Sequence, residues 1–345
     1  MSLIANVITK LERVPLPDRI TSAGIDYLVS QSRRRLTNVP ITAEAEFLRE
    51  MQRYPIASHT ELANAQHYEV PAAFFEQFLG PRRKYSCCYY PDAATTLAEA
   101  ETLALAETVA RADVLDGQSI LELGCGWGAV SLYLAERFPN AKITAVSNSQ
   151  SQRAFITSQA ASRQLSNLAV TTANMNDFAP TGRFDRIISV EMFEHMANWQ
   201  ALLCNVYGWL NPGGRLFLHV FTHRNRSYRF DHADPADWIA QHFFTGGIMP
   251  AHDLVHRFPE LFKVEAEWRW SGANYSRTAM DWLANYDAHS DQVGRILDAV
   301  YGPDAKLWRR RWRLFFLATA SLFGHSQGQE WGIGHYRLAP AGAPQ

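Results

Sequence analysis

Residues 121–129 read LELGCGWGA, a glycine-rich stretch that joins a β-type run to a helical run. Glycine lets the backbone turn sharply and approach a ligand closely, and the first N–H groups of the next helix are free to donate hydrogen bonds. A strand, a tight glycine turn and a helix in this order are typical of the cofactor-binding start of an open α/β sheet. The stretch therefore predicts a nucleotide-cofactor site.

On both sides of this turn, short β-type runs alternate with helical runs. Helical runs at 129–138, 150–163 and 197–210 lie between β-type runs at 119–123, 142–147, 168–172, 184–190 and 214–221. This alternation predicts βαβ units, right-handed crossovers and a Rossmann-like α/β sheet that is mostly parallel. A further β-type run at 331–338 is the expected last strand.

Changes of pattern along the chain divide it into four segments. We expect an N-terminal helical extension at 1–110, a cofactor-binding core at 111–223, a helical substrate-binding insertion or lid at 224–330, and the last strand with a tail at 331–345. The insertion is rich in aromatic residues, which suit either an apolar lid or the packing of its own helices. They are Trp238, Phe243, Phe244, Trp268, Trp270, Tyr275 and Trp282.

Composition narrows the possible partners. With 47% hydrophobic and 19% charged residues in 345, most of the chain should fold, and a net charge of -1 offers no general attraction for nucleic acid or an anionic membrane. No apolar run is long enough for stable membrane insertion, and the charged start does not read as a signal peptide. The cysteines and histidines lack metal-ligand spacing, so we expect no metal, a cytoplasmic location, and either a monomer or a homodimer.

The glycine spacing indicates which cofactor binds. Dinucleotide enzymes use GxGxxG and an acidic residue about 20 positions on, whereas this chain has GxGxG, including Gly124 and Gly126, directly after Glu122. A carboxylate beside the turn suits a cofactor with an amino acid end, S-adenosyl-L-methionine. At the end of the second β-type run, Asn148 and Gln152 replace the missing acid as candidate hydrogen-bonding groups, although both also suit a helix cap.

The adenine of such a cofactor is expected after the third β-type run. Residues 173–178 read ANMNDF. Met175 is the candidate to lie against the ring, and Asn174 or Asn176 the candidate to read its edge. A plain turn capped by Asn176 remains the alternative.

The end of the fourth β-type run is the expected reaction site. Residues 191–196 read EMFEHM, and ligands of open α/β sheets bind at the carboxyl ends of the strands. Glu191, Glu194 and His195 combine two carboxylates with an imidazole, groups that can hold a cationic amine and accept its proton. An acidic helix N-terminus is the alternative interpretation.

With these residues in view, the chain resembles the coclaurine N-methyltransferase-like branch of the cyclopropane fatty acid synthase superfamily of S-adenosylmethionine-dependent methyltransferases. The resemblance spans roughly residues 60–338 and is more specific than the glycine turn alone. Its motifs are KYSCCYY at 84–90, the glycine turn, SNSQSQ at 147–152, EMFEHM at 191–196, HVFTH at 219–223, FFTGG at 243–247 and GQEW at 328–331.

The resemblance implies a class I methyltransferase fold whose last strand is antiparallel, and an enzyme that methylates a nitrogen of a small aromatic or alkaloid-like amine. Glu191, Glu194 and His195 match the amine-handling residues of that branch. Tyr85 and Ser86 match residues that touch the methionine part of the cofactor. These two roles rest on the resemblance alone.

Two other functions stay open. Lipid-modifying members of the superfamily act on an alkene with a bicarbonate held by a Cys, a Glu, a His and a Tyr, which Cys87, Glu194, His219 and Tyr275 match. Glu191 counts against that function, because those members usually carry a small residue there. The third possibility is a non-catalytic cofactor-binding protein, which the intact acidic cluster disfavours.

Overall fold

The computed structural model describes residues 12–14, 16–40, 42–58, 70–235 and 237–342, and its centre is a seven-stranded sheet in the order β3-β2-β1-β4-β5-β9-β8. The first five strands are parallel, β9 is antiparallel to β5, and β8 is antiparallel to β9. The bounds are β1 Ser119–Leu123, β2 Lys142–Ser147, β3 Leu168–Thr172, β4 Phe184–Val190, β5 Leu210–His223, β8 Phe262–Ser271 and β9 Trp331–Pro340.

This sheet confirms the expected fold class, with one strand more than the sequence predicted. Strand β8 lies inside segment 224–330, which we expected to be helical between the fifth and the last strand. Its side chains alternate between exposed Lys263, Glu265 and Glu267 and more buried neighbours, as befits an edge strand with one face in water. Residues 262–270 read FKVEAEWRW, so the period-two alternation is visible in the sequence, but we assigned the whole segment as helical from its overall composition.

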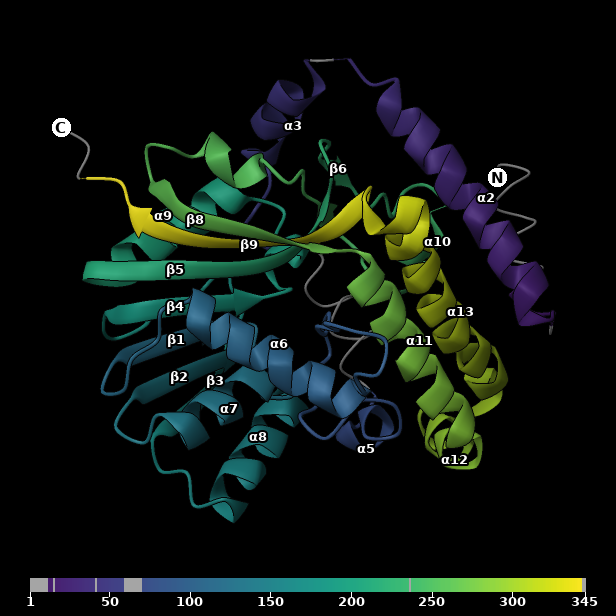
Figure 1. The fold of residues 1–345 in the computed structure, drawn as a ribbon, viewed down its shortest axis with the longest axis horizontal. Helices are drawn as coiled ribbons and strands as arrows, with labels where there is room; N and C mark the ends of the chain where they lie inside the picture. The colour runs from purple at the N-terminus through teal and green to yellow at the C-terminus, as the bar shows by residue number, and fades with distance from the viewer. Residues whose placement is uncertain (1–11, 15, 41, 59–69, 236, 343–345) are drawn as a thin grey trace.

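Helices cover both faces of the sheet. On one face α6 (Leu97–Arg111) and α7 (Ala129–Arg137) share a core with β1, β4 and β5, and α8 (Gln150–Ser162) lies beside α7 (Figure 1). On the other face α9 (Trp199–Trp209) packs against β5. Although α6 falls in the predicted extension 1–110, it packs as part of the sheet domain.

The remaining helices gather beyond one end of the sheet (Figure 1). Strand β9 begins at this end of the sheet and runs away from the helices. Because β9 is antiparallel to β5, the helices face the carboxyl ends of the parallel strands. Many share an aromatic core that includes Phe74, Trp282 and Trp312. These helices are α2 Asp18–Thr37, α5 Ala72–Phe75, α10 Trp238–His242, α11 Ala273–Ala288, α12 Ser290–Tyr301 and α13 Ala305–Gly324.

Short elements complete the fold. A two-stranded sheet pairs β6 (Tyr228–Arg229) with β7 (Ile248–Met249). Helix α3 spans Ala43–Met51, and the 3₁₀ turns are η1 Phe193–His195, η2 Leu254–Arg257, η3 Gly302–Asp304 and η4 His325–Gly328.

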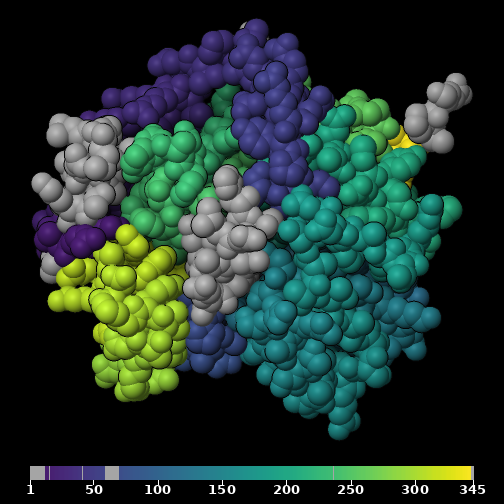
Figure 2. Space-filling model, turned by 180° about the vertical axis from the view of Figure 1, so that it is seen from behind, coloured from purple at the N-terminus to yellow at the C-terminus, as the bar shows by residue number. Residues whose placement is uncertain are grey.

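The N-terminal helices pack onto the segment that follows β5. Figure 2 shows α2 and α3 across the top of the molecule, above residues from this segment. The backbone N–H of Ser227 donates to Glu44 Oε1 over 2.6 Å, and Arg33 pairs with Glu330 at 3.2 Å. Residues 1–11 and 59–69 of the predicted extension lie outside the described residues.

None of the helices in the described ranges is both long and apolar enough to cross a membrane.

The junction of β8 and α11 gives a test of this packing. A Cβ at Gly272 would collide with the carbonyl oxygens of Trp331 and Phe323, which are backbone atoms with little freedom to move. We expect Gly272→Ala to lower the free energy of unfolding by about 1–3 kcal/mol, as overpacking does. Gly208→Ala, inside α9 with nothing within 4 Å among the described residues, should instead be neutral or stabilising. Urea unfolding of both variants is the measurement, and equal midpoints would contradict the close packing.

Candidate active site

The glycine turn after β1 has a backbone that only glycine adopts without strain. Gly124, Gly126 and Gly128 have φ angles of +78°, +50° and +80°. The N–H groups of Gly124 and Cys125 both donate to the carbonyl of Val146 in β2, at 3.0 and 2.9 Å, which fixes the start of the turn.

The surroundings of these glycines differ. A Cβ at Gly124 would lie 2.5 Å from Met192 Cγ, and one at Gly128 would lie 2.7 Å from Ile156 Cγ1. At Gly126 it would meet no described atom within 4 Å. The turn is thus wedged against the segment after β4 and against α8, while its middle faces open space. The turn is therefore fixed at Gly124 and Gly128 and leaves space at Gly126, where the cofactor predicted from the sequence could approach the backbone.

Two polar residues predicted to bind the cofactor are buried and already paired. Glu122 accepts a hydrogen bond from the Ser131 hydroxyl of α7, and burial raises its pKa to about 7 against that hydrogen bond. Gln152 accepts from the Ser147 hydroxyl at 2.6 Å. Both therefore brace the ends of β1 and β2. Asn148, in the turn between β2 and α8, is half-buried.

The segment after β3 is anchored from its far side. Asn176 Oδ1 accepts from the Ala57 N–H at 2.9 Å, and its Nδ2 donates to the Ala57 carbonyl at 3.0 Å. The Asn176 amide is therefore committed to the N-terminal segment. Asn174 accepts from the Asn176 N–H, and Met175 is 8% exposed at the edge of the main core.

Glu191 is the most heavily engaged side chain of the predicted site. It follows β4 with a φ of +47°, a left-handed conformation that is costly for a non-glycine residue. Its Oε1 accepts from the Cys87 N–H at 2.8 Å and from His219 Nε2 at 3.2 Å, and its Oε2 accepts from the Tyr275 hydroxyl at 2.6 Å. Burial raises the pKa of Glu191, and the Lys84 charge and these hydrogen bonds oppose that rise.

Glu194 is buried with far fewer partners. It lies in η1, is 0% exposed, and its Oε1 accepts from the Phe221 N–H at 2.5 Å. Its Oε2 has no hydrogen-bond partner within the described part of the chain. Burial and the neighbouring Glu191 charge raise the pKa of Glu194 well above its ordinary value. Glu194 therefore has one oxygen available for a proton or a cation.

His195 points to an aromatic wall. Its ring stacks on Phe244 with centroids 4.9 Å apart and planes 9° apart. Phe244 in turn contacts Phe221 at 5.7 Å and Phe230 at 5.4 Å. Although Glu191, Glu194 and His195 are close in sequence, their side chains meet different parts of the protein.

Segment 84–88 contacts Glu191 directly and the glycine turn through Phe75, whose ring lies against both Tyr85 and Trp127 of the turn. Cys87 donates to Glu191, and Lys84, 1% exposed, donates through Nζ to the Ser86 hydroxyl and the Cys87 carbonyl, both at 2.6 Å. The Tyr85 ring packs against Phe75 at 5.2 Å. Sequence reasoning missed Lys84 as a site residue; it is the last of three consecutive cations, RRK at 82–84, before six uncharged residues, YSCCYY.

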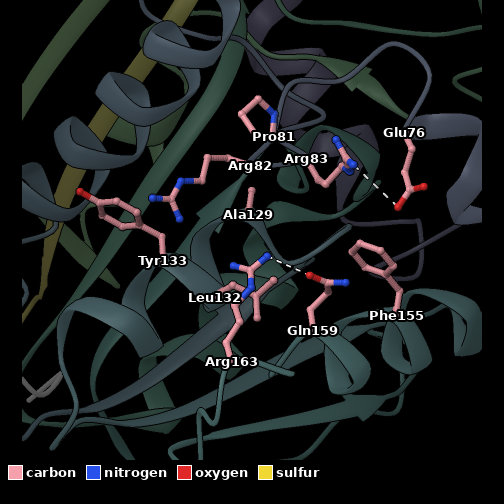
Figure 3. Close-up of a pocket in the computed structure, with 10 residues that line it drawn as sticks. All are labelled: Glu76, Pro81, Arg82, Arg83, Ala129, Leu132, Tyr133, Phe155, Gln159 and Arg163. Atoms are coloured by element: carbon pink, nitrogen blue, oxygen red, sulfur yellow. Dashed lines mark hydrogen bonds and ion pairs between the residues drawn. The ribbon is translucent and has the colours of Figure 1, made fainter. Parts of the chain in front are cut away.

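A small surface cavity elsewhere is separate from this site. It measures about 60 Å³ and lies over α7 and α8, lined by Arg82, Arg163 and others (Figure 3). Both arginines pair with Glu136, at 2.8 and 2.7 Å. It shares no residue with the site above. Within the described ranges, no three His, Cys, Asp or Glu side chains are grouped to hold a metal ion.

The open position in the glycine turn gives a test of cofactor binding. Gly126→Ala should lower the affinity for S-adenosyl-L-methionine at least about tenfold, because its methyl group would occupy the space that the turn leaves open. The backbone strain alone is about 1–2 kcal/mol. Gly117→Ala is the matched control, since Gly117 has a φ of +84° and also nothing within 4 Å among described atoms, but lies in the turn before β1. Calorimetry should show normal affinity for that control; equal affinities for both variants would contradict the assignment.

Comparisons with known proteins identify the family of this chain. The family model for mycolic acid cyclopropane synthetase matches residues 57–330. (S)-Coclaurine N-methyltransferase of Thalictrum flavum subsp. glaucum is 36% identical over 293 residues, 84% of this chain and 80% of that protein. Cyclopropane-fatty-acyl-phospholipid synthase of Escherichia coli is 26% identical over 269 residues, 74% of this chain and 67% of that protein.

A solved structure is also very similar over its whole length. Coclaurine N-methyltransferase bound to N-methylheliamine and SAH matches with a TM-score of 0.93 and 30% identity, covering 98% of this chain and 99% of that one. The chain therefore belongs to the mycolic acid cyclopropane synthetase family and, within it, to the coclaurine N-methyltransferase-like branch of S-adenosylmethionine-dependent methyltransferases.

Proposed function

We propose that this enzyme methylates the nitrogen of a small aromatic or alkaloid-like amine. The names of the similar proteins support this function, since coclaurine N-methyltransferases are more similar to the chain than the lipid-modifying synthase. The observation that carries it is the contrast between two buried carboxyl groups: Glu191 is saturated by hydrogen-bond donors, and Glu194 keeps a free oxygen.

The same contrast argues against the alkene-modifying function. A bicarbonate would need the donors that the resemblance assigns to it, among them Cys87, His219 and Tyr275. In this chain all three donate to the Glu191 carboxylate, which presents the same pair of oxygens as a bicarbonate. The Glu191 side chain thus takes the place of this anion, and an added bicarbonate would find these three donors occupied.

The chemistry requires an amine with a free lone pair. S-Adenosyl-L-methionine supplies an electrophilic methyl group when bound. An amine of pKa near 10 enters mostly protonated at neutral pH, so the enzyme must remove a proton before the nitrogen can act as a nucleophile. We assign that task to the free oxygen of Glu194. His195 orients the amine beside it, and the fixed negative charge of Glu191 stabilises the positive charge that develops on nitrogen.

The remaining assignments follow from the positions of the side chains. We propose that Gly124, Gly126, Tyr85, Ser86 and Asn148 contact the cofactor and that Met175 and Asn174 flank its adenine. Glu122 and Gln152 support the cofactor site indirectly, because their hydrogen bonds fix the ends of β1 and β2. Segment 224–330 provides the substrate wall through Phe244, which stacks on His195, whereas Phe243 and Trp282 of the same segment are core residues. A cytoplasmic location, a homodimer and the absence of a nucleic-acid partner remain expectations.

Replacing Glu194 tests the proton acceptor. Glu194→Gln should lower turnover about 100-fold or more, in the range of general acid–base groups, with cofactor affinity nearly unchanged. Because burial raises the pKa of Glu194 and only the ionised form accepts a proton, wild-type kcat/KM should fall with decreasing pH well above the ordinary carboxyl value of 4.5. The variant should lack this acid limb.

The matched control is Glu330→Gln, which removes another buried carboxyl group, the partner of Arg33 and His223. Its pH profile should keep the acid limb. Unchanged turnover in Glu194→Gln would remove the proposed role.

Replacing Glu191 tests the choice between amine and alkene. Wild-type enzyme should release S-adenosylhomocysteine with benzylisoquinoline or phenethylamine substrates in bicarbonate-free buffer. Glu191→Gly, which also relieves the left-handed backbone, should lose activity, and added bicarbonate or formate should restore part of it by occupying the vacated donors. Glu194→Gln should show no such rescue. Activity on phospholipid vesicles that requires bicarbonate in the wild type would instead establish the lipid-modifying function.

A further inference from the structure

A row of hydrogen-bonded side chains leads from Glu191 across β5 and β9 to Arg111 at the end of α6. His219 on β5 and His335 on β9 are direct cross-strand partners, and both are 0% exposed. His335 Nε2 lies 2.9 Å from His219 Nδ1, and His219 Nε2 lies 3.2 Å from Glu191 Oε1. At the outer end, the guanidinium of Arg111 contacts His335 Nδ1.

Arg111 determines which atom donates in each hydrogen bond of this row. A guanidinium has only donors and stays charged in proteins, so His335 Nδ1 must accept. His335 then carries its hydrogen on Nε2 and donates to His219 Nδ1. His219 in turn carries its hydrogen on Nε2 and donates to Glu191. Each imidazole uses one nitrogen as an acceptor, so both are neutral, in agreement with burial lowering the pKa of each.

Arg111 is held firmly in this position. It is the last residue of α6, pairs with Glu107 at 2.7 Å, and lies 5.2 and 5.3 Å from the ring centroids of Trp268 and Trp270. Its side chain is 15% exposed. Contacts from α6 and β8 therefore determine the guanidinium position independently of the histidine.

Other charged or titratable groups face this row of side chains. Lys84 acts on both histidines and on Glu191, and Tyr275 and His195 act on Glu191. Glu194, Cys87 and Cys88 also lie near the Glu191 charge. At the other end, Glu107 and Tyr89 act on Arg111, and Arg337 donates to its carbonyl.

We propose that Arg111 is a positioning residue which, through His335 and His219, keeps Glu191 an ionised acceptor and closes this route to proton transfer. The inference rests on the proposed amine methylation. A proton leaving Glu191 outward would need a free lone pair on His219 Nε2, and that nitrogen already carries a hydrogen. The two histidines therefore hold Glu191 in place and transfer no proton. The proton of the substrate amine goes instead to Glu194, whose Oε2 has no hydrogen-bond partner among the described residues.

The tautomers provide a direct test that needs no activity. In ¹⁵N-histidine-labelled wild-type protein, NMR should show His219 and His335 neutral with the hydrogen on Nε2 over about pH 6 to 8, where a free histidine would titrate. His219→Asn and His335→Asn variants assign the two signals. A hydrogen on Nδ1 of either residue, or a charged ring at neutral pH, would overturn the proposal.

The pH profile tests the link to Glu191. In Arg111→Gln the row loses a positive charge and a donor-only end, so the pKa of Glu191 should rise and kcat on the acid side should fall about tenfold, with a smaller change at high pH. Arg337→Gln, on β9 beside Arg111 and paired with Glu265, is the matched control and should keep the wild-type profile. A profile for Arg111→Gln that superimposes on the wild type would overturn the link.

The two proposals fail in different ways. If the wild-type enzyme methylates no amine, the proposed function is wrong, while the tautomer measurement keeps its meaning. If Arg111→Gln does not fold, the NMR experiment on wild-type protein still decides the direction of the hydrogen bonds in this row.

Discussion

The carboxylate of Glu191 is the group on which the site depends. A buried charge is tolerated only when hydrogen bonds replace its hydration, and Glu191 has three donors. These donors come from segment 84–88, from β5 and from α11. Satisfying one side chain thus fastens the N-terminal part, the sheet and the segment after β5 to one another, at the point where the glycine turn touches Met192. Removing the charge would loosen the cofactor side and the substrate side together.

Under the proposed mechanism, two acidic residues three positions apart take opposite tasks because their environments differ. Three donors meet Glu191 and oppose the rise in its pKa, whereas Glu194 accepts from backbone N–H groups and has Glu191 as a repelling neighbour. Burial raises the pKa of both carboxyl groups, that of Glu194 well above its ordinary value, which suits Glu191 as the fixed charge and Glu194 as the proton acceptor. The division of roles therefore follows from which elements approach each oxygen.

Sequence alone predicted much of this and missed what depends on distant contacts. The parallel strands and the glycine turn are local patterns, and β1 to β4 begin and end where we expected. Strand β8 was missed although FKVEAEWRW at 262–270 alternates with period two, because the surrounding segment is mostly helical and was assigned as a whole. The cluster of Glu191, Glu194 and His195 was predicted from adjacency, which cannot show that each side chain has different contact partners from distant segments. Arg111 and His335 lie 224 positions apart and meet because α6 packs on the sheet, whereas the pairing of β5 with β9 brings His219 to His335.

Glu191 also shows how one position can separate two chemistries on a shared fold. A bicarbonate held by the same donors would have to bind from solution, at a loss of translational and rotational freedom and with a dependence on its concentration. A carboxylate attached to the chain avoids both, because it is always present at the site. The cost is a non-glycine residue at a φ of +47°, a strain of about 1–3 kcal/mol. The three hydrogen bonds hold the carboxylate in place against that strain. In the proposed function, the left-handed backbone at the end of β4 thus places a permanent carboxylate where a diffusible anion would otherwise bind.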